Sequence, residues 1–563
     1  MSGGIIQDIV YIAILIGIAI PLGIYIYKVM TGQLTWKPIA ALERFTYKVM
    51  RIDPKEEQAA GKYALSVLAF SAFGFGILFL LNLLQEYLPL NPEGMAGMSA
   101  DLAYNTTASF VSNTNWQAYS GESTLSYLTQ MAGLTVQNVV SPAVATAVLF
   151  ALIRGFRRKE SPTVGNFWVD LVKASYYIMI PLAIIVTLLL ISQGVVQNLS
   201  AYVHATTLES GAEQVIPMGP AASQIAIKQL GTNGGGFFGV NSAFPFENPT
   251  PFSNFVECLS LLLIPAALCF TFGRAVQDSK QGRAIFIVML VIFLLALIGM
   301  TMSENMAAPQ FDGVAVSGSM EGKETRFGVD TSALWATATT SASNGSVNSM
   351  HDSFTPLAGG IQMFLMMLGE VVFGGVGCGL YGMLAFAILT VFIAGLMVGR
   401  TPEYLGKKIQ AFDMKMVCLI ILTPPLCLLL GTAFSTFVPT ITNDFTNTGA
   451  HAYSELLYAY TSGAGNNGSA FAGFNANTAY TNIAIGTIML LVRFIPMIAV
   501  IFLSGNLAKK KMIPASGGTL STSNAMFMVF LFLIVFIVGA LTFLPALALG
   551  PIAEFFTTLP ALG

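Results

Sequence analysis

Long apolar runs alternate with polar intervals along all 563 residues of the chain. A helix needs about 20 mostly apolar residues to cross the ~30 Å hydrocarbon layer of a bilayer. The run at 361–398 is too long for one simple helix and holds five glycines (Gly374, Gly375, Gly377, Gly379 and Gly382), so we expect it to be broken. The pattern predicts an all-α polytopic membrane protein with ten transmembrane helices, at 5–27, 65–86, 130–153, 171–193, 252–273, 284–302, 361–398, 415–438, 478–504 and 523–548.

Composition and charge placement support this class and give an orientation. Hydrophobic residues make up 55% of the chain and charged residues 10%, whereas soluble domains carry roughly 25% charged residues. Of the 26 Lys and Arg, 22 lie in the segments 28–62, 154–173, 274–283, 400–415 and 509–511. Cytoplasmic loops carry such an excess, so we expect these five segments in the cytoplasm and both termini outside. Nothing in the charge pattern indicates a nucleic-acid partner.

A repeat recurs four times along the chain. Each unit has a span, a short helical stretch, a polar Asn/Gly loop and a second span. Asn115, Asn233, Gly345 and Gly468 mark the four loops at spacings of 118, 112 and 123 residues. We therefore divide the chain into an N-terminal span and cytoplasmic linker (1–64), four pseudo-symmetric pore repeats (65–158, 159–283, 284–414 and 415–511) and a C-terminal span (512–563).

Irregular backbone at membrane depth is tolerated only where protein buries it or where it lines a water-filled cavity. Four such loops are best accommodated if they converge on one axis, where their carbonyls replace the hydration shell of a cation. Carbonyls favour a monovalent ion, here K⁺, over Ca²⁺ or Mg²⁺. The alternative is four ordinary outer loops, since Asn, Gly and Ser favour turns. The predicted filter residues are Asn113, Thr114, Asn115, Thr232, Asn233, Gly234, Ser343, Asn344, Gly345, Asn466, Asn467 and Gly468.

The first loop has no glycine, so we expect Asn113 or Asn115 to adopt the positive φ that glycine supplies in the other three. Glu370 and Arg493 are the two charges expected within the membrane. Such residues are usually paired or line a pathway. We expect them to meet below the filter and to anchor the break at 374–382, including Gly374, Gly375 and Gly377, as a gate. A structural ion pair with no gating role is the alternative.

Several strings resemble one family, KdpA, the potassium-binding subunit of the bacterial Kdp potassium-transporting ATPase. These strings run nearly from end to end of the chain. They are Asn113-Thr114-Asn115-Trp116-Gln117, Gly231-Thr232-Asn233-Gly234-Gly235-Gly236-Phe237-Phe238, Met350-His351-Asp352-Ser353-Phe354, Gly369-Glu370-Val371-Val372-Phe373-Gly374-Gly375-Val376-Gly377, Gly399-Arg400-Thr401-Pro402-Glu403-Tyr404-Leu405-Gly406-Lys407-Lys408 and Asn466-Asn467-Gly468-Ser469-Ala470-Phe471-Ala472-Gly473.

The resemblance implies a superfamily of K⁺ transporters with four pore-loop repeats, and location in the bacterial plasma (inner) membrane. It also implies partners: a P-type ATPase subunit (KdpB-like), small accessory subunits (KdpC-like and KdpF-like) and membrane lipid. K⁺ is then the transported ion, with no organic cofactor. Two positions depart from the family pattern, Asn344 where a cysteine is expected and Gly465 where a third asparagine is expected.

Two other functions stay open. The chain carries no Asp-Lys-Thr-Gly phosphorylation motif and no G-x-x-x-x-G-K-[ST] loop, so active transport would need an ATP-hydrolysing partner. A stand-alone K⁺ channel or ion-coupled transporter of the same fold is the first alternative. An intramembrane enzyme that uses His351, Asp352 or Cys378 is the second. Asp101, Glu122 and Asp352 are expected on the outer side, either attracting cations to the mouth or as solvated surface charges.

Overall fold

The structure is a computed structural model, which describes residues 2–306, 318–442, 445–514 and 520–558. Within these residues, ten helical segments are long and apolar enough to cross a membrane, which confirms the predicted number. They are α1 (Ser2–Met30), α3 (Ala60–Leu84) with η1 (Gln85–Tyr87), η2 (Thr129–Thr135) with α6 (Val136–Arg157), α7 (Phe167–Lys173) with η3 (Ala174–Met179) and α8 (Ile180–Ser192), α10 (Pro251–Ala275), α11 (Ser279–Met306), α14 (Cys378–Val398), α15 (Ala411–Ser435), α18 (Ala479–Ala508) and α19 (Ala525–Leu549).

Four short helices, called pore helices below, lie among these spans, one before each polar loop. They are α4 (Ala100–Val111), α9 (Ala221–Leu230), α12 (Gly328–Ser341) and α17 (Gly449–Ala464). Most of their residues are buried, including polar ones such as Asn105, Gln229 and Thr337. Each follows one long span and precedes another, while α1 and α19 flank the four units. This order is the predicted fourfold repeat; the exact boundaries of the repeats remain a prediction.

The apolar run at 361–398 is broken, as predicted, and the break overlaps the predicted one but starts and ends earlier. Helix α13 (Pro356–Met367) and helix α14 are separated by the loop 368–377. Gly377 adopts a φ of +87° immediately before α14, a conformation in which glycine is strongly favoured. The predicted break at 374–382 was therefore placed too late, because Gly379 and Gly382 are helical. Glycine tolerates a helix interior where close packing is needed, so composition alone did not locate the break.

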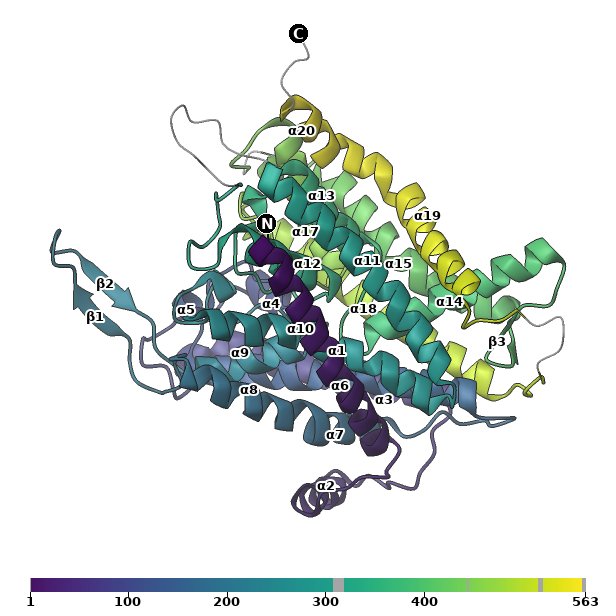
Figure 1. The fold of residues 1–563 in the computed structure, drawn as a ribbon. Coiled ribbons are helices and arrows are strands. Elements are labelled where there is room, and N and C mark those ends of the chain that lie inside the picture. Colours follow the sequence, from purple (N-terminus) through teal and green to yellow (C-terminus); the bar gives the residue numbers. More distant parts are fainter. Residues whose placement is uncertain (1, 307–317, 443–444, 515–519, 559–563) are drawn as a thin grey trace, which may run out of the picture.

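The basic loops gather at one end of the molecule, where α2 (Lys37–Met50) lies (Figure 1). Gln58 pairs with Gly165 as an isolated bridge. The short antiparallel strands β3 (Glu403–Tyr404) and β4 (Lys407–Lys408) also lie at this end, and Lys407 Nζ donates to the Lys510 carbonyl at 2.8 Å. Segments distant in sequence thus form one polar cap.

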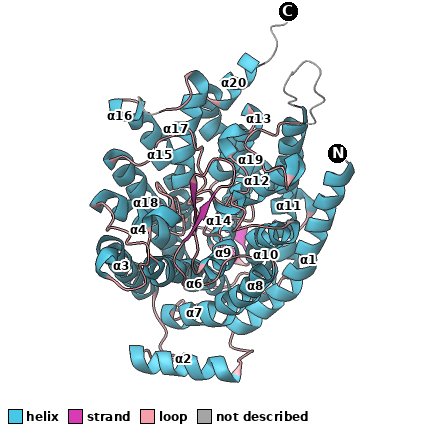
Figure 2. Cartoon of the chain, turned by 90° about the vertical axis from the view of Figure 1, so that its left-hand side faces the viewer, coloured by secondary structure: helices cyan, strands magenta, loops and turns pink. Residues whose placement is uncertain are grey.

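The opposite end carries the N-terminal end of α1 and the helix α20 (Pro551–Thr558), as Figures 1 and 2 both show. The other short elements of the long polar intervals are α5 (Gly121–Thr124), η4 (Asn241–Ala243), η5 (His351–Ser353), α16 (Pro439–Thr442) and the antiparallel strands β1 (Val203–Thr206) and β2 (Glu213–Ile216), in which Val203 faces Ile216. The two ends therefore differ in character as the sequence predicts, one being basic and the other rich in Asn, Gly and Ser.

Apolar side chains cover both the interior and much of the outer surface. The main core packs α6, α10 and α14 together, with residues such as Leu149, Leu261 and Leu384 fully buried. On the outside, Leu65, Leu188 and Leu541 are 67%, 63% and 78% exposed. A soluble protein does not expose large apolar patches of this kind, so these helix faces suit the hydrocarbon of a bilayer.

Candidate functional site: four loops that close into a ring

The four polar loops share one backbone pattern. In each loop, the first and third of the three predicted filter residues have positive φ, and the residue between them does not. The pairs are Asn113 and Asn115, Thr232 and Gly234, Ser343 and Gly345, and Asn466 and Gly468. Both asparagines of the first loop, at φ 66° and 54°, adopt the geometry that glycine supplies elsewhere, and Asn tolerates this region better than most residues. The matching position in the second loop is Gly234, one residue after the marker predicted from sequence.

The loops contact one another in a closed order. A β-carbon added to Gly234 of the second loop would overlap the Asn344 carbonyl oxygen of the third. One added to Gly345 would overlap the Asn467 oxygen of the fourth loop, and one added to Gly468 would overlap the Thr114 oxygen of the first. The first and second loops are joined by hydrogen bonds, including Asn113 Nδ2 to the Thr232 carbonyl at 3.0 Å. The loops therefore form a ring, and at three of its four joints a glycine allows the close contact.

Asparagine side chains brace this ring from behind. Asn344 Nδ2 donates to the Lys228 carbonyl at 3.0 Å, near the end of the preceding pore helix. Asn467 Nδ2 likewise donates to the Thr339 carbonyl at 2.8 Å. Asn115 Nδ2 donates to Asn138 Oδ1 at 2.7 Å. These amide N–H groups donate to protein partners, so the three side chains hold the loops in place.

The two positions expected from the sequence to depart from the family pattern both form contacts between neighbouring loops or helices. The Asn344 side chain bonds to backbone on both sides, because its Oδ1 accepts from Ser346 N at 2.9 Å. Gly465 contributes only its carbonyl, which accepts from Ser343 Oγ at 2.5 Å. With Asn344 and Gly465 in place, the third and fourth loops have the same backbone pattern as the other two.

The electrostatics of the ring favour a cation. Each loop begins where a pore helix ends, at Val111, Leu230, Ser341 and Ala464. The C-terminus of a helix carries a partial negative charge equivalent to roughly half an elementary charge. The twelve predicted filter residues are all buried except Gly468, which is half-buried. Four negative helix ends and buried carbonyls thus surround a site that holds no Asp or Glu.

Cavities lie on both sides of the ring and are very different in size. One of about 540 Å³ is lined by the third residues Asn115, Gly345 and Gly468 and by residues of the polar intervals. One of about 40 Å³ is lined by the first residue Asn466 and by Glu370, Cys378 and Arg493. A cavity needs roughly 10–15 Å³ to hold one water molecule, so the small one accommodates only a few. The ring separates a wide vestibule from a narrow inner chamber.

Comparisons with known proteins identify the family. The family described as "Potassium-transporting ATPase A subunit", KdpA, matches residues 9–556. This chain belongs to the KdpA family. Among its relatives, the "potassium-transporting ATPase potassium-binding subunit" of Listeria welshimeri is 60% identical over 98% of this chain and 99% of its own length. The protein of the same name from Clostridium perfringens is 59% identical over 99% of both chains.

A solved structure shows a similar fold. The potassium transporter TrkH from Vibrio parahaemolyticus superposes with a TM-score of 0.52, covering 87% of this chain and 98% of the TrkH chain. The sequences are only 12% identical, so the likeness concerns the fold. It supports the all-α architecture predicted for this KdpA chain.

Glu370 and Arg493 do meet beneath the ring, but through a third residue. Cys378 Sγ accepts from Arg493 Nη1 at 3.1 Å and donates to Glu370 Oε2 at 2.8 Å. Among the described residues the two charges form no direct ion pair, because the first residue of α14 lies between them. Val376 N, in the adjoining loop, donates to Thr232 Oγ1 at 2.9 Å. The loop 368–377 is therefore attached to the inner end of the ring.

A buried charged network beside the ring was missed by the sequence reasoning. Lys228, in the last turn of α9, forms a fully buried ion pair with Glu247. Ser242 Oγ lies within hydrogen-bond distance of both carboxylates, 2.9 Å from Glu247 Oε1 and 2.7 Å from Glu257 Oε2. The only signal in the sequence was a lysine immediately before the second polar loop, on the side that has few basic residues. Such a pair is costly to break once it is buried.

Proposed function

We propose that this chain binds K⁺ in the ring of main-chain oxygens and passes it on for ATP-driven import by a partner P-type ATPase subunit. The observation that carries the proposal is the closed ring of four loops between a wide vestibule and a small inner chamber. The relatives' names, which specify a potassium-binding subunit of a potassium-transporting ATPase, agree with it.

Main-chain carbonyls of the twelve filter residues named from the sequence would replace the hydration shell of the ion. The asparagine amides that bond to neighbouring backbone support this assignment, since their role is to hold the ring. The lack of a carboxylate among the filter residues favours a monovalent cation over Ca²⁺. Glycine and asparagine are needed there for backbone conformation and close packing.

From the ring the ion would enter the inner chamber, where Glu370 and Arg493 lie with Cys378 between them. We propose that this group and the loop containing Gly374, Gly375 and Gly377 form a gate. The hydrogen bond from Val376 N to Thr232 Oγ1 supports a coupling between gate and filter. A purely structural role for the same three side chains is the competing proposal, and a variant described in the Discussion separates the two.

The proposed partners are a KdpB-like P-type ATPase subunit and small KdpC-like and KdpF-like subunits, in the plasma (inner) membrane of a bacterium. The polar cap would face the cytoplasm, and the vestibule would face the outside. Both termini would also lie outside, following the distribution of Lys and Arg. The apolar outer faces would contact lipid or partner helices. Isolation from native membranes tests this. A copurifying ATPase that K⁺ stimulates supports it, and a homogeneous chain without ATPase activity contradicts it.

A stand-alone K⁺ channel or ion-coupled transporter is the second candidate, because the TrkH fold is that of a potassium transporter. K⁺ flux into vesicles that contain only this chain, without ATP, would favour it. The intramembrane enzyme has less support, since His351 lines the outer vestibule while Cys378 lines the inner chamber. The described structure does not gather these residues into one catalytic group.

A further inference from the structure

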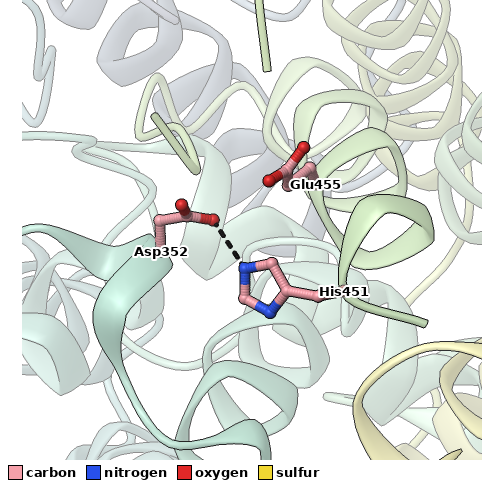
Figure 3. Close-up of side chains that lie close together, drawn as sticks. All are labelled: Asp352, His451 and Glu455. Atoms are coloured by element: carbon pink, nitrogen blue, oxygen red, sulfur yellow. Dashed lines mark hydrogen bonds and ion pairs between the residues drawn. The ribbon is translucent and has the colours of Figure 1, made fainter. Parts of the chain in front are cut away.

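A second polar cluster lies on the fourth pore helix, away from the ring. His451 and Glu455 are four residues apart on α17, so they share one face of that helix. Asp352, from η5 of the third repeat, meets them there (Figure 3). Each of the three side chains offers one ligand atom, and these three atoms lie within 4.8 Å of one another. His451 Nε2 is 3.0 Å from Asp352 Oδ1.

Glu455 is the member whose environment most favours a cation. Its side chain is fully buried, and its Oε1 accepts from Asn447 Nδ2 at 2.7 Å. Its Oε2 is buried with no hydrogen-bond partner among the described residues. Figure 3 shows the carboxylate lying beside the gap between Asp352 and His451. A buried carboxylate oxygen without a partner is strongly unfavourable, and a cation in this gap would satisfy it.

A fourth residue holds the imidazole ring from behind. His451 Nδ1 lies 2.9 Å from Glu554 Oε1, on α20. A histidine that binds a metal through one nitrogen almost always gives its other N–H to a carboxylate or carbonyl, which fixes the ring. Glu554 is placed to do this, and it leaves Nε2 directed at Asp352.

We propose that Asp352, His451 and Glu455 bind one divalent transition-metal cation of the zinc class. Imidazole favours such metals, whereas Mg²⁺ and Ca²⁺ prefer all-oxygen sites. Bond lengths of about 2.0–2.2 Å in a tetrahedral site place ligand atoms roughly 3.4 Å apart, so the present separations require only small side-chain movements. Three protein ligands leave one position for water. The bound metal would tie the third repeat to the fourth pore helix and, through Glu554, to α20.

The site is tested on the full-length chain in detergent, with Co²⁺ as a visible-absorbing probe and Zn²⁺ as competitor. The wild type is expected to bind one Co²⁺ that Zn²⁺ displaces. His451→Ala and Glu455→Gln should each weaken binding at least 100-fold, and Glu554→Gln about 10- to 100-fold. The matched control is His204→Ala, which removes an exposed histidine also paired with a glutamate, Glu213, and should leave binding unchanged.

Glu455→Gln keeps the side-chain shape, so it remains informative if His451→Ala does not fold; size-exclusion chromatography and K⁺ binding report the fold of each variant. The proposal is overturned if wild-type protein binds no Co²⁺ below about 100 µM. It is equally overturned if folded Glu455→Gln binds as tightly as wild type, or if only the His204 variant loses the metal. In those cases His451 would be an imidazolium held between Asp352 and Glu554. Co²⁺ absorption and size-exclusion chromatography do not depend on transport. A failure of the proposed metal site would therefore leave the proposed K⁺ filter unaffected.

Discussion

Replacing Gly234 by alanine tests whether the ring is the K⁺ site. Gly234 has a φ of +101°, and a β-carbon there would overlap the Asn344 carbonyl oxygen of the next loop. Alanine would have two effects. The left-handed conformation is unfavourable by about 1–2 kcal/mol for a residue with a β-carbon. The β-carbon would also push apart the second and third loops, which contact through that oxygen. A displacement of about 1 Å is enough to lose 100-fold in a positioned site.

The control for backbone strain is Gly94→Ala. Gly94 also has positive φ, +64°, but a β-carbon there meets nothing within 4 Å. Both variants should lose similar stability from φ alone, while only Gly234→Ala should lose K⁺ affinity. We expect a loss of at least tenfold, which is about 1.4 kcal/mol of binding free energy.

Calorimetric titration of KCl into purified protein in a K⁺-free buffer measures this affinity directly. In the complex, the K⁺ concentration for half-maximal ATPase activity is the matching readout. Thermal unfolding of both variants shows whether the strain is comparable. Folded Gly234→Ala protein that binds K⁺ within threefold of wild type would refute the assignment of the ring as the ion site.

Three further predictions concern the surroundings of the ring. Arg493→Met should leave K⁺ affinity within about threefold but change K⁺-stimulated turnover; unchanged flux would reject the gate. Lys228→Met should destabilise the fold by about 3–5 kcal/mol, because it leaves Glu247 buried and unpaired, and Glu247→Gln in the same chain should restore part of the melting temperature; a single variant as stable as wild type would contradict this. Burial raises the pKa of the half-buried Glu122 carboxyl above 4.5, with the nearby Glu247 adding to the effect. The folded state then holds this proton to higher pH than the unfolded state, so stability falls as pH rises above that value. Glu122→Gln should therefore gain melting temperature relative to wild type at pH 7 and lose this advantage toward pH 4, and an advantage that grows toward pH 4 would disprove it.

Much of the fold could be predicted because membrane constraints act locally. The positions of the spans follow from the length of apolar runs, and the conformation of Asn113 and Asn115 follows from the lack of glycine in the first loop. The sequence-based prediction was wrong where packing between segments decides the position of a loop or the start of a helix. The second loop aligns at Gly234 because that residue contacts the third loop, and Gly379 continues α14 because it packs closely on Gly374.

Other features depend on residues that are far apart in sequence. Cys378 lies between Glu370 and Arg493 because α14 begins there, and no charge pattern shows this. In the sequence, Lys228 is one of the few basic residues on the outer side. The structure shows that its charge is neutralised by Glu247, which lies in the polar interval that follows. Asp352 and His451 are 99 residues apart, so their meeting could not be read from either local motif.

The sequence alone determined that the chain is a membrane protein with ten spans and four pore loops, since each follows from the solvent that a segment requires. It also determined which residue types the loops need for their backbone conformation. The tertiary structure decided which carbonyl meets which glycine, where the broken helix bends and which side chains gather at His451. Hydropathy and turn preference act within a few neighbouring residues, whereas these contacts depend on how separate helices pack.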